Sequence, residues 1–335
     1  MRTGGCTGPT VHFTRDTILS IKKDTFLKNK ENKHQFLQML SRNLQTIGCK
    51  TIHARADADT LIVETAINSA RTMDTVLMGD DTDLLILFCY HADMNSKDIF
   101  FQPQLKSNST KCMVWDIKKT KELLGSNVCE VILFIHAILG CDTTSRLHGL
   151  GKASALKMVT KDSNFHTLAQ TFCSDELQSQ ETIIKAGELA LVRLYNGSDT
   201  DSLDTLRYKR YYEKLKKAVK AVEAKTLPPT SAAAKFHSLR VYIQVKEWEG
   251  KCELDPKEWG WKEANSLLLP VTTDLPPAPS NLLEMIRCNC KTGCNTLRCS
   301  CLKNGLECTS ACGNCEGLSC SNAGAKVEFV DDDEQ

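Results

Sequence analysis

The chain has 335 residues, of which 25% are charged and 41% hydrophobic, the balance of an ordinary globular protein. Its net charge is +1, so no global field attracts a polyanion, and any nucleic-acid partner must be met by local patches. The sequence contains no run of about 18 apolar residues, and Met1–Thr10 lacks an apolar signal core. We therefore expect neither membrane insertion nor secretion.

The first third of the chain alternates predicted helices and strands. Apolar residues recur at helical spacing over Lys33–Ile47, and Cys49–Ala54 is typical of a short strand. A helix is predicted to begin at Asp57 or Asp59, and Thr75–Met78 has the composition of a buried strand.

Strand and helix continue to alternate beyond the apolar run Leu84–Cys89. Met113–Asp116 is predicted to be a strand, followed by a helix to Leu124 and a very apolar helix over Val128–Leu139. This alternation favours an α/β fold with a mostly parallel sheet flanked by helices.

The second half is predicted to be a helical extension. We expect helices over Ala153–Val159 and within residues 165–195. The predicted helix Leu206–Lys225 carries eight Lys and Arg residues against two Glu, so it is either a solvated face or a phosphate-binding surface. Residues 235–270 hold three tryptophans, of which Trp259 and Trp261 are interpreted as core anchors rather than base-stacking platforms.

Five aspartates follow the predicted strands and helices in a suggestive order: Asp57, Asp59, Asp81, Asp83 and Asp142. In an open α/β sheet, ligands gather at the carboxyl ends of the strands. Clustered carboxylates repel one another unless a divalent cation neutralises them, and Mg²⁺ and Mn²⁺ prefer oxygen ligands. The alternative is that each aspartate only caps a helix or forms a turn.

Three short motifs around these acids resemble the flap-endonuclease superfamily, whose nucleases have a PIN-like core. Asp57-Ala58-Asp59 is similar to the acid-Ala-acid start of a family helix, and Gly79-Asp80-Asp81-Thr82-Asp83 to its acid-x-acid turn. The segment from His136 to Thr144 resembles the one that supplies a further metal-binding aspartate. The resemblance implies that Asp57, Asp59, Asp81, Asp83 and Asp142 bind Mg²⁺ or Mn²⁺.

A fourth motif, His148-Gly149-Leu150-Gly151-Lys152, resembles the helix–three-turn–helix element that grips the backbone of duplex DNA. The resemblance assigns Gly149, Gly151 and Lys152 to nucleic-acid binding. Glycines permit close approach, and the amides of a helix N-terminus bind phosphate.

One part of the family pattern has no match in this sequence. The family begins with an apolar strand that ends in a metal-binding aspartate, whereas Asp16 and Asp24 lie in polar surroundings. We therefore expect a nuclease-like domain with weak or absent activity; if active, it is a Mg²⁺-dependent structure-specific endonuclease or exonuclease. The region that follows the predicted core also resembles invertebrate proteins of mobile-element character, which implies no chemistry.

The 17 cysteines are unevenly distributed, with eight scattered singly from Cys6 to Cys252 and nine crowded into Cys288–Cys320. Scattered free thiols are typical of a reducing compartment, where a dense cluster binds metal instead of forming disulfides. Four thiolates bind zinc tetrahedrally, and nine sulfurs hold three zinc ions if three of them bridge. The predicted ligands are Cys288, Cys290, Cys294, Cys299, Cys301, Cys308, Cys312, Cys315 and Cys320.

The spacing of these cysteines resembles the tesmin-type CXC domain, a DNA-binding zinc module of nuclear regulators. Arg298 occupies the position where that family usually has a tyrosine that enters the minor groove, and arginine is also a competent minor-groove residue. The resemblance assigns Arg287, Lys291, Arg298 and Lys303 to DNA binding.

These patterns predict six segments and one principal function. The segments are a polar N-terminal stretch (1–32), a PIN-like core (33–160), a helical and aromatic extension (161–270), a proline-rich linker (271–286), a CXC zinc module (287–323) and an acidic tail (324–335). We expect a DNA-binding protein of the nucleus or cytoplasm. The alternative is a non-enzymatic scaffold in which zinc is purely structural.

Overall fold

A computed structural model gives the fold of the protein. It describes residues 8–54, 57–104, 113–217, 222–250, 254–265, 267–275, 286–291, 293–309, 312–318 and 320–323. The fold is mixed α/β, with about 52% helix and 7% strand. The predicted linker lies mostly outside the described residues, and the predicted acidic tail lies wholly outside them.

The N-terminal segment contains helices α1, Lys23–Lys28, and α2, Lys30–Thr46. The side chain of Asn29 caps α2 by accepting hydrogen bonds from the backbone amides of Glu31 and Asn32. Helix α2 confirms the helix predicted over Lys33–Ile47.

The strand predicted over Cys49–Ala54 is wrong, because these residues form a loop without sheet partners. Hydrogen bonds to α2 explain the loop: the hydroxyl of Thr51 lies 2.7 Å from that of Ser41 and accepts a bond of 2.7 Å from Gln45. A short β-prone run needs a neighbouring strand to pair with, and here side chains of α2 take that place.

The acidic motifs lie on the next three elements: helix α3, Asp59–Ala70; strand β1, Thr75–Met78; and helix α4, Thr82–His91. The predicted helix is confirmed, and the apolar run after the acidic turn is part of α4. The strand over Thr75–Met78 is also present, but its prediction as a buried strand is wrong, because Leu77 is its one buried residue. The cap of α3 is Ala58, without a side-chain bond, so neither predicted aspartate caps this helix.

The main sheet has three short strands in the order β1-β2-β3. Strand β2, Ile99–Gln102, pairs parallel with β1, and β3, Trp115–Asp116, pairs antiparallel with β2. The described residues therefore form no large, mostly parallel sheet. The predicted α/β class is confirmed, whereas a mostly parallel sheet is not shown, because one of the two strand pairs is antiparallel and α4 takes up the apolar run that follows the acidic turn.

Helices α5, Ile117–Leu124, and α6, Ser126–Leu139, follow β3 as predicted. Every residue of α6 from Val131 to Leu139 is buried, which makes it a core helix. No single helix in the described part of the chain is long and apolar enough to cross a bilayer; α5 and α6 pass that test only as a pair bent by 98°.

The second half is helical, as expected. Its first helices are α7, Lys152–Lys161; α8, Ser163–Cys173; α9, Gln180–Leu194; and α10, Leu203–Lys217. A 3₁₀ turn, η1, covers Ala224–Thr226.

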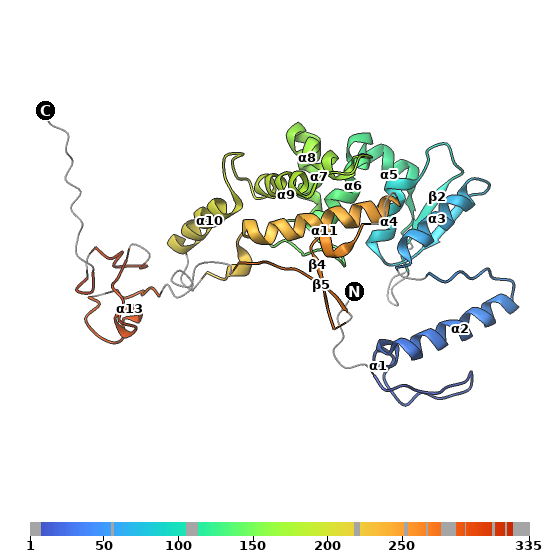
Figure 1. The fold of residues 1–335 in the computed structure, drawn as a ribbon, viewed down its shortest axis with the longest axis horizontal. Helices are drawn as coiled ribbons and strands as arrows, with labels where there is room; N and C mark the ends of the chain where they lie inside the picture. Colours follow the sequence, from blue (N-terminus) through green and yellow to red (C-terminus); the bar gives the residue numbers. More distant parts are fainter. Residues whose placement is uncertain are drawn as a thin grey trace.

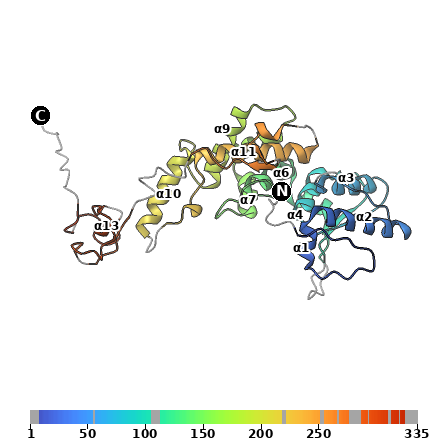
Figure 2. The ribbon, with the colours of Figure 1, turned by 60° about the horizontal axis from the view of Figure 1, so that its bottom comes forward.

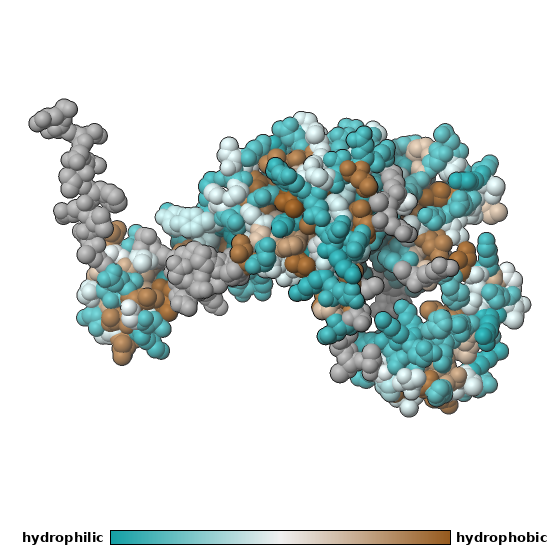
Figure 3. Space-filling view, in the orientation of Figure 1, coloured by the Kyte–Doolittle hydropathy of each residue, from teal (hydrophilic) through white to brown (hydrophobic). Residues whose placement is uncertain are grey.

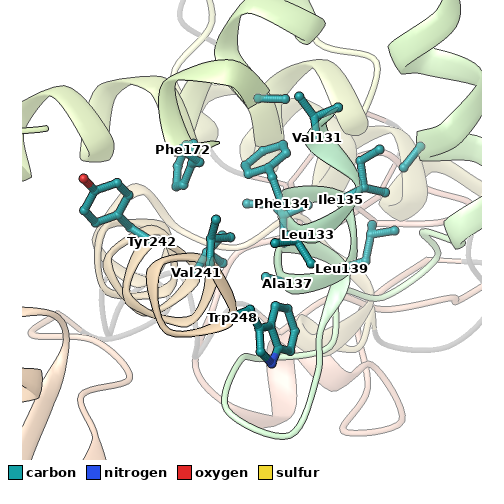
Figure 4. Packing of buried hydrophobic residues seen from close by; sticks show 14 of the residues in the cluster. Val131, Leu133, Phe134, Ile135, Ala137, Leu139, Phe172, Val241, Tyr242 and Trp248 are labelled. Atoms are coloured by element: carbon teal, nitrogen blue, oxygen red, sulfur yellow. The ribbon is translucent and has the colours of Figure 1, made fainter. Parts of the chain in front are cut away.

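Helix α11, Ser231–Glu249, organises the core. It packs against α6, α8 and α9, and both ribbon views show it beside α6 and α9 (Figures 1 and 2). In the close-up, Tyr242 of α11 points toward Phe172 of α8, and Trp248 lies beside Ala137 of α6 (Figure 4). One hydrophobic core therefore runs from α3 to Trp259.

The chain continues through η2, Pro256–Glu258, and the antiparallel pair β4, Trp261–Ala264, and β5, Leu267–Pro270. Trp259 is 6% exposed and stacks on Tyr242 at 4.7 Å, so the core-anchor interpretation holds for it. The cysteine module contains one short helix, α13, Ser300–Lys303.

Hydrophilic side chains cover most of the face drawn in Figure 3, with hydrophobic ones scattered among them. At the sheet edge, Val76 and Met78 of β1 are 53% and 64% exposed. In the cysteine module, Leu297 and Leu318 are 72% and 70% exposed. These two leucines therefore contribute little to the interior of the module.

Candidate metal centres

The helices place the five predicted aspartates in one region. Asp59 is the first residue of α3, Asp81 caps α4, and Asp83 lies in the first turn of α4. Helix α3 packs on α4, and α4 packs on α6, after whose end the chain reaches Asp142. Elements distant in sequence thus bring the acids together.

The electrostatics of Asp59 show how close these acids are. Burial raises the pKa of Asp59 from 3.8 to about 6, and the negative charges of Asp57, Asp81, Asp83 and Asp142 add to the increase. The cluster is therefore a concentration of negative charge of which only Asp83 has an ion-pair partner within 4.0 Å among the described residues.

The turn before α4 is also structural, as the alternative interpretation expected. Oδ1 of Asp81 accepts a 3.0 Å hydrogen bond from the amide of Asp83, and Oδ1 of Asp80 accepts one of 2.8 Å from the amide of Gln104. Capping occupies one oxygen of Asp81. Its other oxygen forms no hydrogen bond with a described residue, so the two roles are compatible.

Asp83 has a buried partner on α6. Nε2 of His136 lies 2.6 Å from Oδ1 of Asp83, and the two side chains are 3% and 14% exposed. The imidazole ring stacks on Trp248 of α11, with centroids 5.5 Å apart. Our sequence analysis quoted His136 within a motif but gave it no role, since its contact with Asp83 spans 53 positions of sequence.

The loop that carries Asp142 is held by α11. The hydroxyl of Thr143 donates to Oε1 of Gln244, and Thr144 donates a 2.6 Å bond to the carbonyl of Ala137. Gly140 opens the loop at φ +109°, and a Cβ there would lie 2.6 Å from the Cα of Arg146. The position of Asp142 therefore depends on a helix about 100 residues later in the chain.

Gly149, Gly151 and Lys152 lie in the loop before α7 and at its start. Gly149 has φ +76°, and no atom lies within 4 Å of a Cβ placed at either glycine, so the backbone is open to approach. Burial lowers the pKa of Lys152, while the charges of Asp83, Cys141 and Asp81 oppose the shift. Lys152 thus lies beside the acidic cluster, a proximity that the motif did not predict.

One further acid lies near the cluster. Glu247 of α11 has its pKa raised by burial and then by the charge of Asp57. No local pattern marked Glu247, because it lies on a helix remote in sequence.

These residues alone do not form a complete shell of oxygen ligands for a cation. In the described part of the chain, three or more ligand atoms of His, Cys, Asp or Glu lie within 4.8 Å of one another only in sets of cysteines. The donor chemistry of the acidic cluster fits Mg²⁺ or Mn²⁺, whose octahedral shell is usually completed by water and substrate phosphate.

The cysteine module is built around sulfur. Seven of its cysteines are buried, and Leu302 is the partly buried side chain of another type that packs against them. Five pairs of sulfur atoms lie 3.6–3.9 Å apart. A disulfide bond is about 2.05 Å long. By contrast, four thiolates at about 2.3 Å from one zinc ion lie about 3.8 Å from each other.

Three overlapping sets of four cysteines can each hold a metal ion. They are Cys288, Cys299, Cys301 and Cys308; Cys288, Cys294, Cys308 and Cys315; and Cys288, Cys290, Cys294 and Cys299. Cys288 belongs to all three sets. The sulfur of Cys312, which is in none of them, lies 3.6 Å from the sulfur of Cys301. All the described cysteines are free thiols, so the module can bind metal.

Backbone amides favour the thiolate form at two of these sulfurs. Burial opposes ionisation of Cys299, but hydrogen bonds including those from the Leu302 and Cys301 amides lower its pKa to about 6. The Gly317 amide similarly helps to lower the pKa of Cys315 to about 7. Amide donors aimed at sulfur are a typical outer shell of a metal–thiolate site.

The cations assigned to DNA binding differ in their surroundings. Lys291, Arg298 and Lys303 are exposed on the module. Arg287 instead donates a 2.8 Å hydrogen bond to the carbonyl of Leu215 in α10, which gives it a structural role.

Most of the basic side chains of helix α10 form hydrogen bonds or ion pairs within the protein. Arg207 donates to the carbonyl of Pro228, and Lys214 donates to that of Thr226. Lys209 pairs with Asp201 at 2.7 Å, and Arg210 with Glu213 at 3.0 Å. These contacts favour the structural interpretation of this helix over phosphate binding.

Comparison of the chain with known protein families, curated proteins and solved structures finds no match. The resemblances to flap endonucleases and to CXC domains therefore rest on the motifs themselves.

Proposed function

We propose that this chain is a nucleic-acid-binding protein with two metal centres. One is a divalent-cation site at the acidic cluster of Asp57, Asp59, Asp81, Asp83 and Asp142, and the other is a zinc site in the cysteine module. The observation that carries the proposal is the packing of α3 on α4 and of α4 on α6, which brings Asp59, Asp81 and Asp83 close to the loop that carries Asp142.

The acidic cluster fits a phosphodiester substrate only with a cation present. Five carboxylates repel a phosphate, whereas Mg²⁺ or Mn²⁺ bound there would neutralise both and polarise the phosphoryl oxygen. Asp81 and Asp83 would hold the cation through their free oxygens. Lys152, whose charge interacts with Asp81 and Asp83, and the open backbone at Gly149 and Gly151 would contact the phosphates of the nucleic acid.

The cysteine module supplies the second contact with nucleic acid. Three zinc ions shared among nine cysteines would fold a segment that has little other core, because metal binding and folding are coupled in such modules. Exposed Lys291, Arg298 and Lys303 then present positive charge to DNA. This tethering would hold DNA near the α/β body even if the acidic site is slow.

A cleavage assay tests the proposal. Flap and hairpin DNA are incubated with the zinc-loaded chain and Mn²⁺, beside the variant Asp81→Asn/Asp83→Asn. We expect weak, metal-dependent cleavage by the wild type and at least a hundredfold loss in the variant. Equal cleavage by both would remove the acidic cluster as the active site.

The alternative is a scaffold protein in which zinc serves only folding. The contacts of α10 favour this scaffold function, because most of its basic side chains bind other groups of the protein and few are available for phosphate. The two functions differ at low salt, where a scaffold has no affinity for DNA and a DNA-binding protein has its highest affinity.

A further inference from the structure

His136 is the polar exception in a buried apolar helix. The other buried residues of α6 are aliphatic, aromatic or cysteine, and the His136 side chain is only 3% exposed. Its Nδ1 has no hydrogen-bond partner in the described structure. A buried polar atom without a partner destabilises the fold, so a leucine or phenylalanine would suit the packing better.

The contact with Asp83 explains which nitrogen carries the proton. An ionised carboxylate only accepts hydrogen bonds, so Nε2 must donate the 2.6 Å bond to Oδ1 of Asp83. The neutral ring then leaves Nδ1 as a bare acceptor. This tautomer leaves no N–H group buried without a partner.

The ring is held from its other face by α11. Trp248 is 3% exposed and stacks on His136, and the carbonyl of Trp248 accepts a 2.7 Å bond from Nε2 of His91 on α4. Helices α4, α6 and α11 therefore fix both the imidazole and the carboxylate to which it donates.

We propose that His136 is a positioning residue that orients Asp83 toward a divalent cation in the acidic cluster, an inference that rests on the proposed function. With Oδ1 engaged by His136, Oδ2 is the oxygen of Asp83 that forms no hydrogen bond with a described residue and is left for a cation. Asp81 is oriented in the same way, because the Asp83 amide engages its Oδ1. Ligands with an outer-shell hydrogen bond bind metal more tightly, since their orientation is fixed before the metal arrives.

The test measures Mn²⁺ affinity of the full, zinc-loaded chain by electron paramagnetic resonance of free Mn²⁺. His136→Phe keeps an aromatic ring against Trp248 but removes the donor. His136→Gln restores an N–H donor. His166→Phe is the matched control, because it removes a histidine of α8 that bonds the backbone carbonyl of Asn127 at the other end of α6.

We expect His136→Phe to weaken Mn²⁺ binding by roughly 10–100-fold, with His136→Gln recovering most of the loss. The control His166→Phe should bind Mn²⁺ within about threefold of the wild type, since His166 bonds a backbone carbonyl and no carboxylate of the cluster. Wild-type affinity in a folded His136→Phe variant would overturn the inference and leave the proposed function standing. Absence of Mn²⁺ binding by the wild type would overturn both.

A second measurement needs no variant of His136. In ¹⁵N-labelled wild-type protein, the ring should show the tautomer protonated at Nε2, with a slowly exchanging proton. Substoichiometric Mn²⁺ should broaden this signal, and Asp83→Asn should abolish the broadening. A ring protonated only at Nδ1, or a signal indifferent to Mn²⁺, contradicts the inference.

Discussion

A methyl group at Gly187 of α9 would lie 2.0 Å from the Oγ and 2.5 Å from the Cβ of Ser238 on α11. The two helices therefore cross as closely as their backbones allow. A glycine inside a helix usually weakens it, whereas α9 continues through Gly187 and the missing side chain permits the crossing.

Gly187→Ala should destabilise the protein by about 1–3 kcal/mol, because overpacking outweighs the better helix propensity of alanine. Tryptophan fluorescence during denaturant unfolding measures this, since all four tryptophans lie outside the cysteine module. Gly151→Ala is the control, because its added Cβ meets no atom within 4 Å. Adding Ser238→Gly should reduce the cost of Gly187→Ala; strictly additive effects would contradict the close contact.

The raised pKa of Asp59 makes stability depend on pH. In the folded chain Asp59 titrates at about 6, and in the unfolded chain near 3.8. Between these values the folded state binds the extra proton, so stability falls as pH rises through this window. At neutral pH the ionised group destabilises the fold, on the order of 1–2 kcal/mol for a half-buried carboxylate.

Asp59→Asn should therefore be more stable than the wild type at pH 7.5, and the difference should shrink toward pH 4. Denaturant unfolding of both proteins across this range measures it. Added Mg²⁺ should stabilise the wild type more than the variant at pH 7.5. A difference that does not change with pH would contradict the electrostatic origin.

The spacing of residues along the chain predicted those elements whose structure depends on one continuous segment alone. The helical spacing before Ile47, the apolar run Val128–Leu139 and the cysteine spacing each specify a structure without distant partners. Strand β2, Ile99–Gln102, was not predicted, and the strand over Cys49–Ala54 was predicted wrongly. Both depend on whether a neighbouring strand is present, which a local pattern does not contain.

Of the candidate site, the sequence indicated the carboxylates but not the side chains that surround them. The order of Asp57 to Asp142 indicated the cluster, but the groups around it come from distant helices. His136 bonds Asp83 across 53 positions, and Gln244 bonds Thr143 across 101. Such contacts follow from the packing of α11 against α6, which depends on two apolar faces that have no distinctive spacing.

The metal content of the cysteine module is a third prediction. Reduced full-length protein should contain about three zinc ions, since nine thiolates with three shared supply twelve bonds. Cys288→Ser should lose the most zinc, because its sulfur belongs to all three candidate sets. Elemental analysis of purified variants measures this. The exposed Cys49→Ser is the control, and equal zinc content in Cys288→Ser would contradict the shared-sulfur arrangement.

A buried ion pair supports α11 and gives a fourth prediction. Nζ of Lys246 lies 2.7 Å from Oε2 of Glu249, with both side chains at most 2% exposed. Lys246 also donates to the carbonyl of Ser174, and Glu249 accepts from the hydroxyl of Tyr90. Removing one partner leaves the other buried and charged, which typically costs 3–5 kcal/mol.

Lys246→Met should therefore destabilise the protein by about 3–5 kcal/mol, and Glu249→Gln in the same background should recover part of the loss. Denaturant unfolding of the two single variants and the double variant measures the coupling. The exposed pair Lys185–Glu181 is the control, and its removal should cost under about 1 kcal/mol. Equal costs for the two pairs would mean that burial does not govern the interaction.

The salt dependence of DNA binding separates the cations of the module. Each phosphate contact contributes about 0.9 to the slope of log affinity against log salt. Arg298 and Lys303 are exposed, so Arg298→Ala should lower the slope by about one and Arg298→Ala/Lys303→Ala by about two. Fluorescence anisotropy with labelled duplex DNA over a range of salt concentrations measures both, and Lys185→Ala on α9 is the control.

Arg287→Ala should behave differently from these variants. Its guanidinium bonds the carbonyl of Leu215, so its loss should loosen the contact between the module and α10 while leaving the salt slope within about 0.3 of the wild-type value. A drop of about one in slope for Arg287→Ala, with none for Arg298→Ala, would reverse the assignment. Phosphate contact would then belong to the face of the module beside α10.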